Sequence, residues 1–86
     1  MFEAVEFIER PHELEPEERP LGEFADEMDA VRAAREARQA FMADGSKHYA
    51  WWIVRKPGAR LAQFISDSKS DKEFVLDLTS GQLVEV

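Results

Sequence analysis

The chain has 86 residues, no cysteine and a formal net charge of −7, and hydrophobic residues make up 44% of it. This length allows one small domain, and the hydrophobic share argues against wholesale disorder. The lack of cysteine excludes disulfides and zinc sites built from thiolates. We see no leader-like segment and no apolar run of about 20 residues, so we expect a soluble cytoplasmic protein that has no membrane partner.

The charge is unevenly distributed along the chain. Residues 1–29 hold eleven acids and two bases, a net −9, whereas residues 44–72 hold six bases and three acids, a net +3. An acidic segment beside a basic one can accompany a nucleic-acid surface, but blocks of like charge are usually just solvated. We therefore expect the acidic residues to form a solvated segment.

The first 22 residues contain one predicted strand and one predicted loop. Residues 1–9, MFEAVEFIE, are rich in Val, Ile and Phe and suit a strand whose glutamates fit an edge or a partly exposed position. Residues 10–22 are rich in proline and glutamate, and proline lacks the amide proton that regular structure uses. We expect an acidic, Pro-rich loop over 10–22 within a single domain over 1–86.

A helix is predicted between Asp26 and Gly45. Asp26 suits the N-cap, acidic residues follow it in the first turn, and Gly45 can close the C-terminal end. An apolar stripe recurs at helical spacing and consists of Ala30, Val31, Ala34, Ala37 and Phe41. Because this stripe has little bulk, we expect the helix to lie close to a sheet.

The remaining residues predict a strand meander. Strands are expected near 48–56 and 60–66, joined at Pro57-Gly58 by a turn that can be longer by a residue or two, and then at 73–78 and 82–86. The predicted order is β-α-β-β-β-β. The fold class is therefore α+β, with one α-helix packed on a mostly antiparallel sheet.

Trp51 and Trp52 are neighbours in a predicted strand, so their side chains must point to opposite faces of the sheet. One helix covers one face, and the other face would expose Tyr49, Trp51 and Ile53, with Phe64 or Ile65 beside them. Such an aromatic patch is large enough to mark an interaction site. Three covers are possible: the acidic loop or a curled sheet, a second copy of the chain, or another macromolecule or ligand.

Few residues are candidates for catalysis or metal binding. His48 could lie near Asp44 or Asp67, but a histidine at a hairpin base commonly makes an ordinary hydrogen bond, and His12 has no evident partner. The serines and acids of residues 66–71 lack calcium-loop spacing and a base for a nucleophile, so we predict a polar turn. We predict no catalytic residues, no metal site and no cofactor.

The sequence thus favours a non-enzymatic protein-interaction module that self-associates as a homodimer through its aromatic strand face. The predicted partner-binding residues are Tyr49, Trp51, Ile53, Phe64, Arg55, Lys56 and Arg60. The alternative is a single-stranded nucleic-acid-binding domain that uses the basic hairpin tip of Arg55, Lys56 and Arg60 and stacks bases on exposed aromatic rings. The net charge of −7 opposes that alternative.

Overall fold

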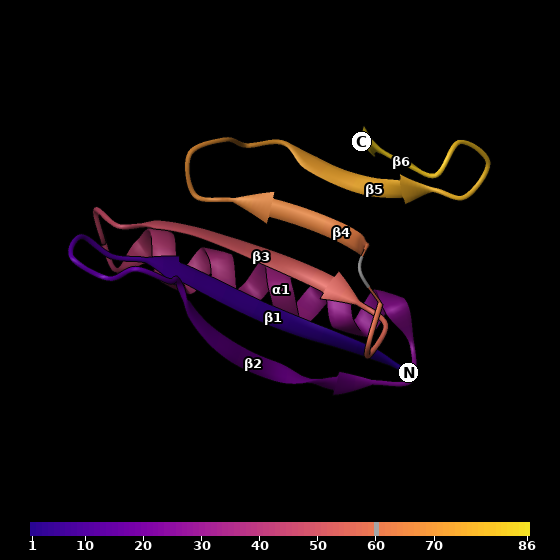
Figure 1. The fold of residues 1–86 in the computed structure, drawn as a ribbon, viewed down its shortest axis with the longest axis horizontal. Coiled ribbons are helices and arrows are strands. Elements are labelled where there is room, and N and C mark those ends of the chain that lie inside the picture. Colours follow the sequence, from indigo (N-terminus) through magenta and orange to yellow (C-terminus); the bar gives the residue numbers. More distant parts are fainter. Residues whose placement is uncertain (60) are drawn as a thin grey trace.

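The computed structural model describes residues 1–59 and 61–86, and within them the chain forms six strands and one helix (Figure 1). The elements are β1 Phe2–Glu9, β2 Glu17–Phe24, α1 Glu27–Ala43, β3 Tyr49–Arg55, β4 Ala62–Asp67, β5 Glu73–Asp77 and β6 Gln82–Glu85. The strands form one antiparallel sheet in the order β2-β1-β3-β4-β5-β6. The predicted α+β class, with one helix packed on an antiparallel sheet, is confirmed.

The element order differs from the predicted one because two strands, and not one, precede the helix. Residues 17–22 lie in β2 and not in the loop expected over 10–22, so only residues 10–16 connect β1 to β2. β2 tolerates Pro20 because it lies at the edge of the sheet and pairs with β1 on one side. The missing backbone N–H of proline therefore costs no hydrogen bond to a second neighbouring strand. The charged residues Glu17, Glu18 and Arg19 also suit an edge, since they discourage pairing with other chains.

The helix begins and ends where the sequence predicts. The side chain of Asp26 accepts a hydrogen bond from the backbone N–H of Met28 at 2.9 Å, which satisfies one of the free donors of the first turn. At the other end, Gly45 follows the cap residue Asp44 with a φ angle of 72°, a conformation that glycine adopts without strain.

The core lies between α1 and the strands β1 and β3. Its buried side chains are Ala4, Ile8, Ala30, Val31, Ala34, Ala50, Trp52, Val54 and Phe64. The helix contributes mainly alanines, so it approaches the sheet closely, and the sheet contributes the bulk. The largest of these residues, Trp52, is fully buried, and Phe41 of the helix packs edge-on against its ring.

One acidic residue is buried in this core. Glu6 stands opposite Trp52 across β1 and β3, is only 6% exposed, and accepts a hydrogen bond from the Trp52 indole Nε1 at 2.8 Å. Arg19 of β2 lies 3.4 Å from the other carboxylate oxygen. The acidic N-terminal segment is therefore not simply solvated as expected, because Glu6 serves as a paired structural group.

The helix is also tied to β5 by an ion pair. Arg35 donates through Nε and Nη2 to the two carboxylate oxygens of Glu73 at 2.9 and 2.8 Å. These hydrogen bonds lower the pKa of Glu73 below its ordinary value of 4.5, and the same hydrogen bonds raise the pKa of Arg35.

We expect this pair to contribute pH-dependent stability. Since the pKa of Glu73 is lower in the folded state, its contribution is present above about pH 4.5 and is lost as the pH falls through the lowered pKa. Urea unfolding should show Glu73→Gln to be less stable than the wild type at pH 7 by under about 1 kcal/mol, because the pair is partly exposed. That difference should shrink below pH 4.5; a difference that stays constant down to acid pH would contradict the prediction.

Candidate interaction face

The sheet has a second face, which points away from α1. In Figure 1 this face is turned toward the viewer, and α1 lies behind β1 and β3. In residues 1–59 and 61–86 the helix packs only on the opposite side. We call the second side the open face, and its apolar side chains are Val5, Phe7, Tyr49, Trp51, Ile53, Ile65, Phe74 and Leu76.

The pairing register places these side chains in one continuous band. Val5, Ile53, Ile65 and Phe74 stand side by side on the neighbouring strands β1, β3, β4 and β5. Apolar side chains on both faces of a strand are typical of a strand that is covered on both sides. The open face therefore has the composition of a covered surface. At its centre Val5 and Ile53 are already only 2% and 9% exposed, so its accessible apolar area comes from the partly buried side chains around them.

An aromatic cluster lies at one end of the open face. The rings of Phe7 and Trp51, which stand opposite each other on β1 and β3, are stacked at 5.2 Å with an interplanar angle of 10°. The ring of Tyr49 lies 5.5 Å from that of Trp51. All three side chains are partly buried, so each still presents some ring area to solvent. Phe7 was not among the predicted partner-binding residues, although it lies two residues after Val5 and therefore on the same face of β1.

Three of the predicted partner-binding residues share this face. Tyr49 and Trp51 are partly buried there, and Trp52 is the tryptophan under the helix. Ile53 also belongs to the open face but is only 9% exposed, and it stands between Val5 of β1 and Ile65 of β4. A partner would therefore contact mainly the rings of Tyr49 and Trp51.

Phe64 does not belong to the open face, and its inclusion among the partner-binding residues is corrected here. It stands opposite Val54, points toward α1 and is 1% exposed. Its neighbour Ile65 takes the place on the open face, opposite Ile53. The pairing shifts between Val54 and Arg55, and such a shift sets the register in a way that alternation along one strand does not reveal.

Of the two described residues of the predicted basic hairpin tip, Arg55 is paired with carboxylates. Arg55 forms ion pairs with Glu3 of β1 and with Glu18 of β2, the latter at 3.5 Å. Lys56 is exposed, and its ammonium group lies 5.9 Å from the ring centre of Phe2. Arg60 lies outside the described residues. The charge of Arg55 is thus already balanced by two carboxylates, which leaves less of it for phosphate groups.

The two histidines are both exposed, and His48 lines a shallow hollow of about 250 Å³ with Glu9, Arg10, Pro11, Lys47 and Tyr49. His48 is exposed, and within residues 1–59 and 61–86 its recorded hydrogen bond is from its backbone N–H to the hydroxyl of Ser46 at 3.3 Å. Of the two carboxylates predicted near it, Asp67 accepts a hydrogen bond from the Tyr49 hydroxyl at 3.2 Å, and Asp44 is the C-cap residue of α1. His12 is exposed in the connection between β1 and β2.

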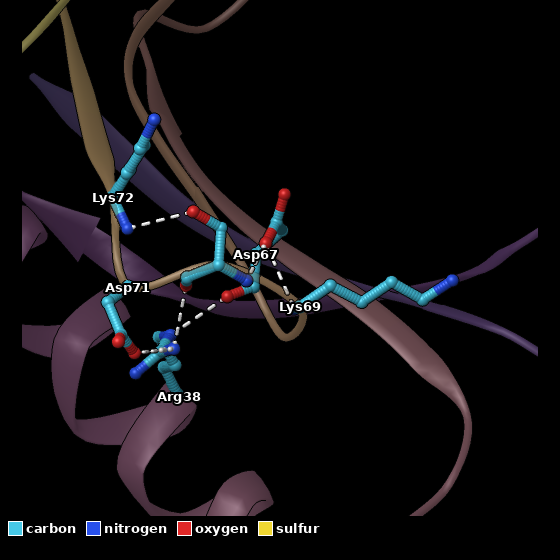
Figure 2. A network of polar contacts seen from close by, with 6 residues as sticks. Arg38, Asp67, Lys69, Asp71 and Lys72 are labelled. Carbon is cyan, nitrogen blue, oxygen red and sulfur yellow. Dashed lines mark hydrogen bonds and ion pairs between the residues drawn. The ribbon is translucent and has the colours of Figure 1, made fainter.

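The polar residues between β4 and β5 form an ordered turn that the helix holds in place (Figure 2). Arg38 donates through Nε to the carbonyl of Asp67 and through Nη2 to the carbonyl of Ser70, both at 2.9 Å. One oxygen of Asp67 accepts the backbone N–H groups of Lys69 and Ser70 at 3.0 and 2.8 Å. In the described part of the chain, no group of three or more His, Asp or Glu side chains is placed to hold a metal ion.

Comparisons of the chain with known protein families, with curated proteins and with solved structures found no match. Among the described residues no helix is both long and apolar enough to cross a membrane.

Proposed function

We propose that this protein is a non-enzymatic protein-interaction module that self-associates through its open face. The observation that supports this proposal is the apolar band across β1, β3, β4 and β5, together with the partly exposed rings of Tyr49 and Trp51. Aromatic residues are enriched in the buried centres of protein interfaces, and each aromatic side chain can bury about 150–250 Å².

The dimensions of the molecule suit an interface of standard size. The molecule measures 37 × 26 × 24 Å, and the open face lies on its broadest side. That side has room for the about 800 Å² per partner that a stable interface buries. A closed two-fold dimer is the commonest assembly for such a self-complementary face.

The charges at the rim also suit a second copy. Arg55 forms ion pairs with Glu3 and Glu18, so its positive charge is already matched by carboxylates of the same chain. At the aromatic end of the open face, Glu9 is acidic and Lys69 is basic. In a two-fold dimer the acid of one copy can lie opposite the base of the other. We place this role in the cytoplasm, because a chain without cysteine needs no oxidising compartment to fold.

Nucleic-acid binding has less support. The rings of Tyr49 and Trp51 could stack on bases, but Arg55 of the predicted basic tip is paired with carboxylates and the chain carries −7 overall. Phosphate neutralisation supplies most of the affinity in such complexes, and this surface has little free positive charge.

The test is the absolute molar mass in solution, measured by light scattering over a concentration series at two salt concentrations. We expect a mass that rises from 9.9 kDa toward twice that value. Trp51→Ser should raise the dimer dissociation constant at least about tenfold, because a buried interface tryptophan is a typical hot spot.

Met42→Ser is the matched control, because it removes an exposed apolar side chain from the helix, away from the open face. Its dissociation constant should match that of the wild type. A mass of 9.9 kDa at every concentration would overturn the self-association. Equal dissociation constants for Trp51→Ser and the wild type would overturn the role of the open face in it.

A further inference from the structure

A hollow of about 270 Å³ lies at the aromatic end of the open face. It is lined by Glu9, Tyr49, Trp51, Ile65 and Asp67, which come from the adjacent strands β1, β3 and β4. The lining therefore combines two aromatic rings with two carboxylates. Aromatic faces attract cations through their ring quadrupole, and carboxylates attract them through their charge.

The walls of this hollow are fixed before any ligand arrives. The Trp51 ring is stacked on Phe7, and the Tyr49 hydroxyl donates a hydrogen bond to Asp67 at 3.2 Å. Asp67 is itself held, because its other carboxylate oxygen accepts two backbone N–H groups of the turn that Arg38 clamps. A preorganised site loses less entropy on binding than a flexible one.

A cation of the chain itself already lies against one of the two rings that line the hollow. The ammonium group of Lys69 lies 5.0 Å from the centre of the Tyr49 ring, which is cation–π geometry. Figure 2 shows the Lys69 side chain leading away from the turn and its Arg38 network. Lys69 is exposed, so its ammonium group can leave the ring without disturbing buried structure.

The electrostatic environment of Tyr49 points the same way. The pKa of Tyr49 is raised, first by burial and then by the negative charges of Asp67 and Glu9. The phenol therefore stays protonated and keeps its hydrogen bond to Asp67 at neutral pH. The same negative charges favour an incoming cation and disfavour an anion.

We propose that this hollow binds the ammonium group of a lysine side chain from another protein chain, and that Lys69 is a tethered competitor for it. This inference rests on the proposed function, since it names the group that a partner surface places at the aromatic end of the open face. The two rings supply the cation–π contacts, and Glu9 supplies the accessible carboxylate. Asp67 mainly holds Tyr49 in position.

The probe is Nα-acetyl-lysine N-methylamide, titrated into protein that light scattering shows to be monomeric, at constant ionic strength. The readout is the NMR signal of the indole N–H groups. We expect the Trp51 signal to move with saturation at about tens of millimolar, the weak range of a single small ligand. The Trp52 signal is an internal reference, because that ring is buried and bonded to Glu6.

Two further probes separate the sources of the cation. The Nε-acetylated form of the same compound is neutral and should not move the Trp51 signal. n-Butylammonium tests a free amine: weaker binding than the blocked lysine assigns the site to a protein side chain, whereas equal or tighter binding overturns that assignment in favour of small amines.

Substitutions of two lysines give the sharpest test. Lys69→Met should tighten binding of the blocked lysine by about two- to fivefold, because it removes an exposed ammonium group that competes for the Tyr49 ring. Lys72→Met makes the same charge change at a lysine that pairs with Glu85, and it should leave the affinity unchanged. Glu9→Gln should weaken binding by a similar two- to fivefold, as expected for an exposed ion pair.

The inference is overturned if the Trp51 signal does not move, if the neutral probe moves it equally, or if both lysine substitutions tighten binding to the same extent. Its failure is distinguishable from failure of the proposed function. A protein that dimerises but binds no lysine probe loses only this inference, whereas a protein that binds the probe but stays monomeric loses only the self-association.

Discussion

Replacing Trp52 with alanine is expected to lower the free energy of unfolding by about 3–5 kcal/mol, the usual cost of removing a large aromatic side chain from a core. Trp52 is fully buried, packs against Phe41 of the helix and donates a hydrogen bond to the buried carboxylate of Glu6. The substitution would leave both a cavity and a poorly paired acid. Urea unfolding, followed by circular dichroism, measures the loss.

A milder variant keeps this prediction testable if the alanine variant does not fold. Trp52→Phe retains most of the ring but removes the indole donor, so it should cost about 1–3 kcal/mol, the penalty for leaving a buried polar group unpaired. Trp51→Ala is the matched control on the other face. Trp51 is only partly buried, and losing its stacking on Phe7 should cost about 1 kcal/mol. Equal losses at the two tryptophans would refute the assigned faces.

Replacing Arg38 with methionine is expected to destabilise the protein by about 2–3 kcal/mol, because two hydrogen bonds from a charged group are lost. Arg38 is the clamp that joins the helix to the carbonyls of Asp67 and Ser70. Without this clamp the turn between β4 and β5 should open more often. Hydrogen exchange should therefore accelerate at the amides of Lys69 and Ser70, which now donate to Asp67.

Arg32→Met is the control, since Arg32 lies on the same helix but makes only an exposed pair with Asp29. Its cost should stay under about 0.5 kcal/mol. Arg38→Lys should recover little of the lost stability, because an ammonium group does not reproduce the planar fork that reaches both carbonyls. Similar stability of the Arg38→Met and Arg32→Met variants would show that the clamp contributes nothing.

The features that the sequence predicted correctly depend on neighbours in the chain. The Asp26 cap, the Gly45 ending and the alanine stripe follow from rules that operate over a few residues. The opposite faces of Trp51 and Trp52 follow from alternation along one strand. These rules were sufficient to predict the fold class and the presence of an aromatic face.

The errors arose where structure depends on distant residues or on position in the sheet. Pro20 was taken to exclude a strand. A proline is tolerated in an edge strand, however, and the residue pattern of one segment does not show whether that segment will lie at the edge of the sheet. Phe64 was misplaced because the pairing shifts beside Arg55. The acids that neutralise Arg55 come from β1 and β2, dozens of residues earlier in the chain, so a count of local charges overstated the basic tip.

The position of β6 has a consequence for how the molecule opens. The helix packs on β1, β2 and β3, and β5 is tied to it through Glu73, whereas β6 pairs only with β5 and is exposed along its whole length. Stability in such a fold is graded, since segments with few buried contacts unfold locally at little cost. We therefore expect β6 to detach from β5 and rejoin while Trp52 and the helix stay in place, so that opening at this edge of the sheet does not require unfolding of the core.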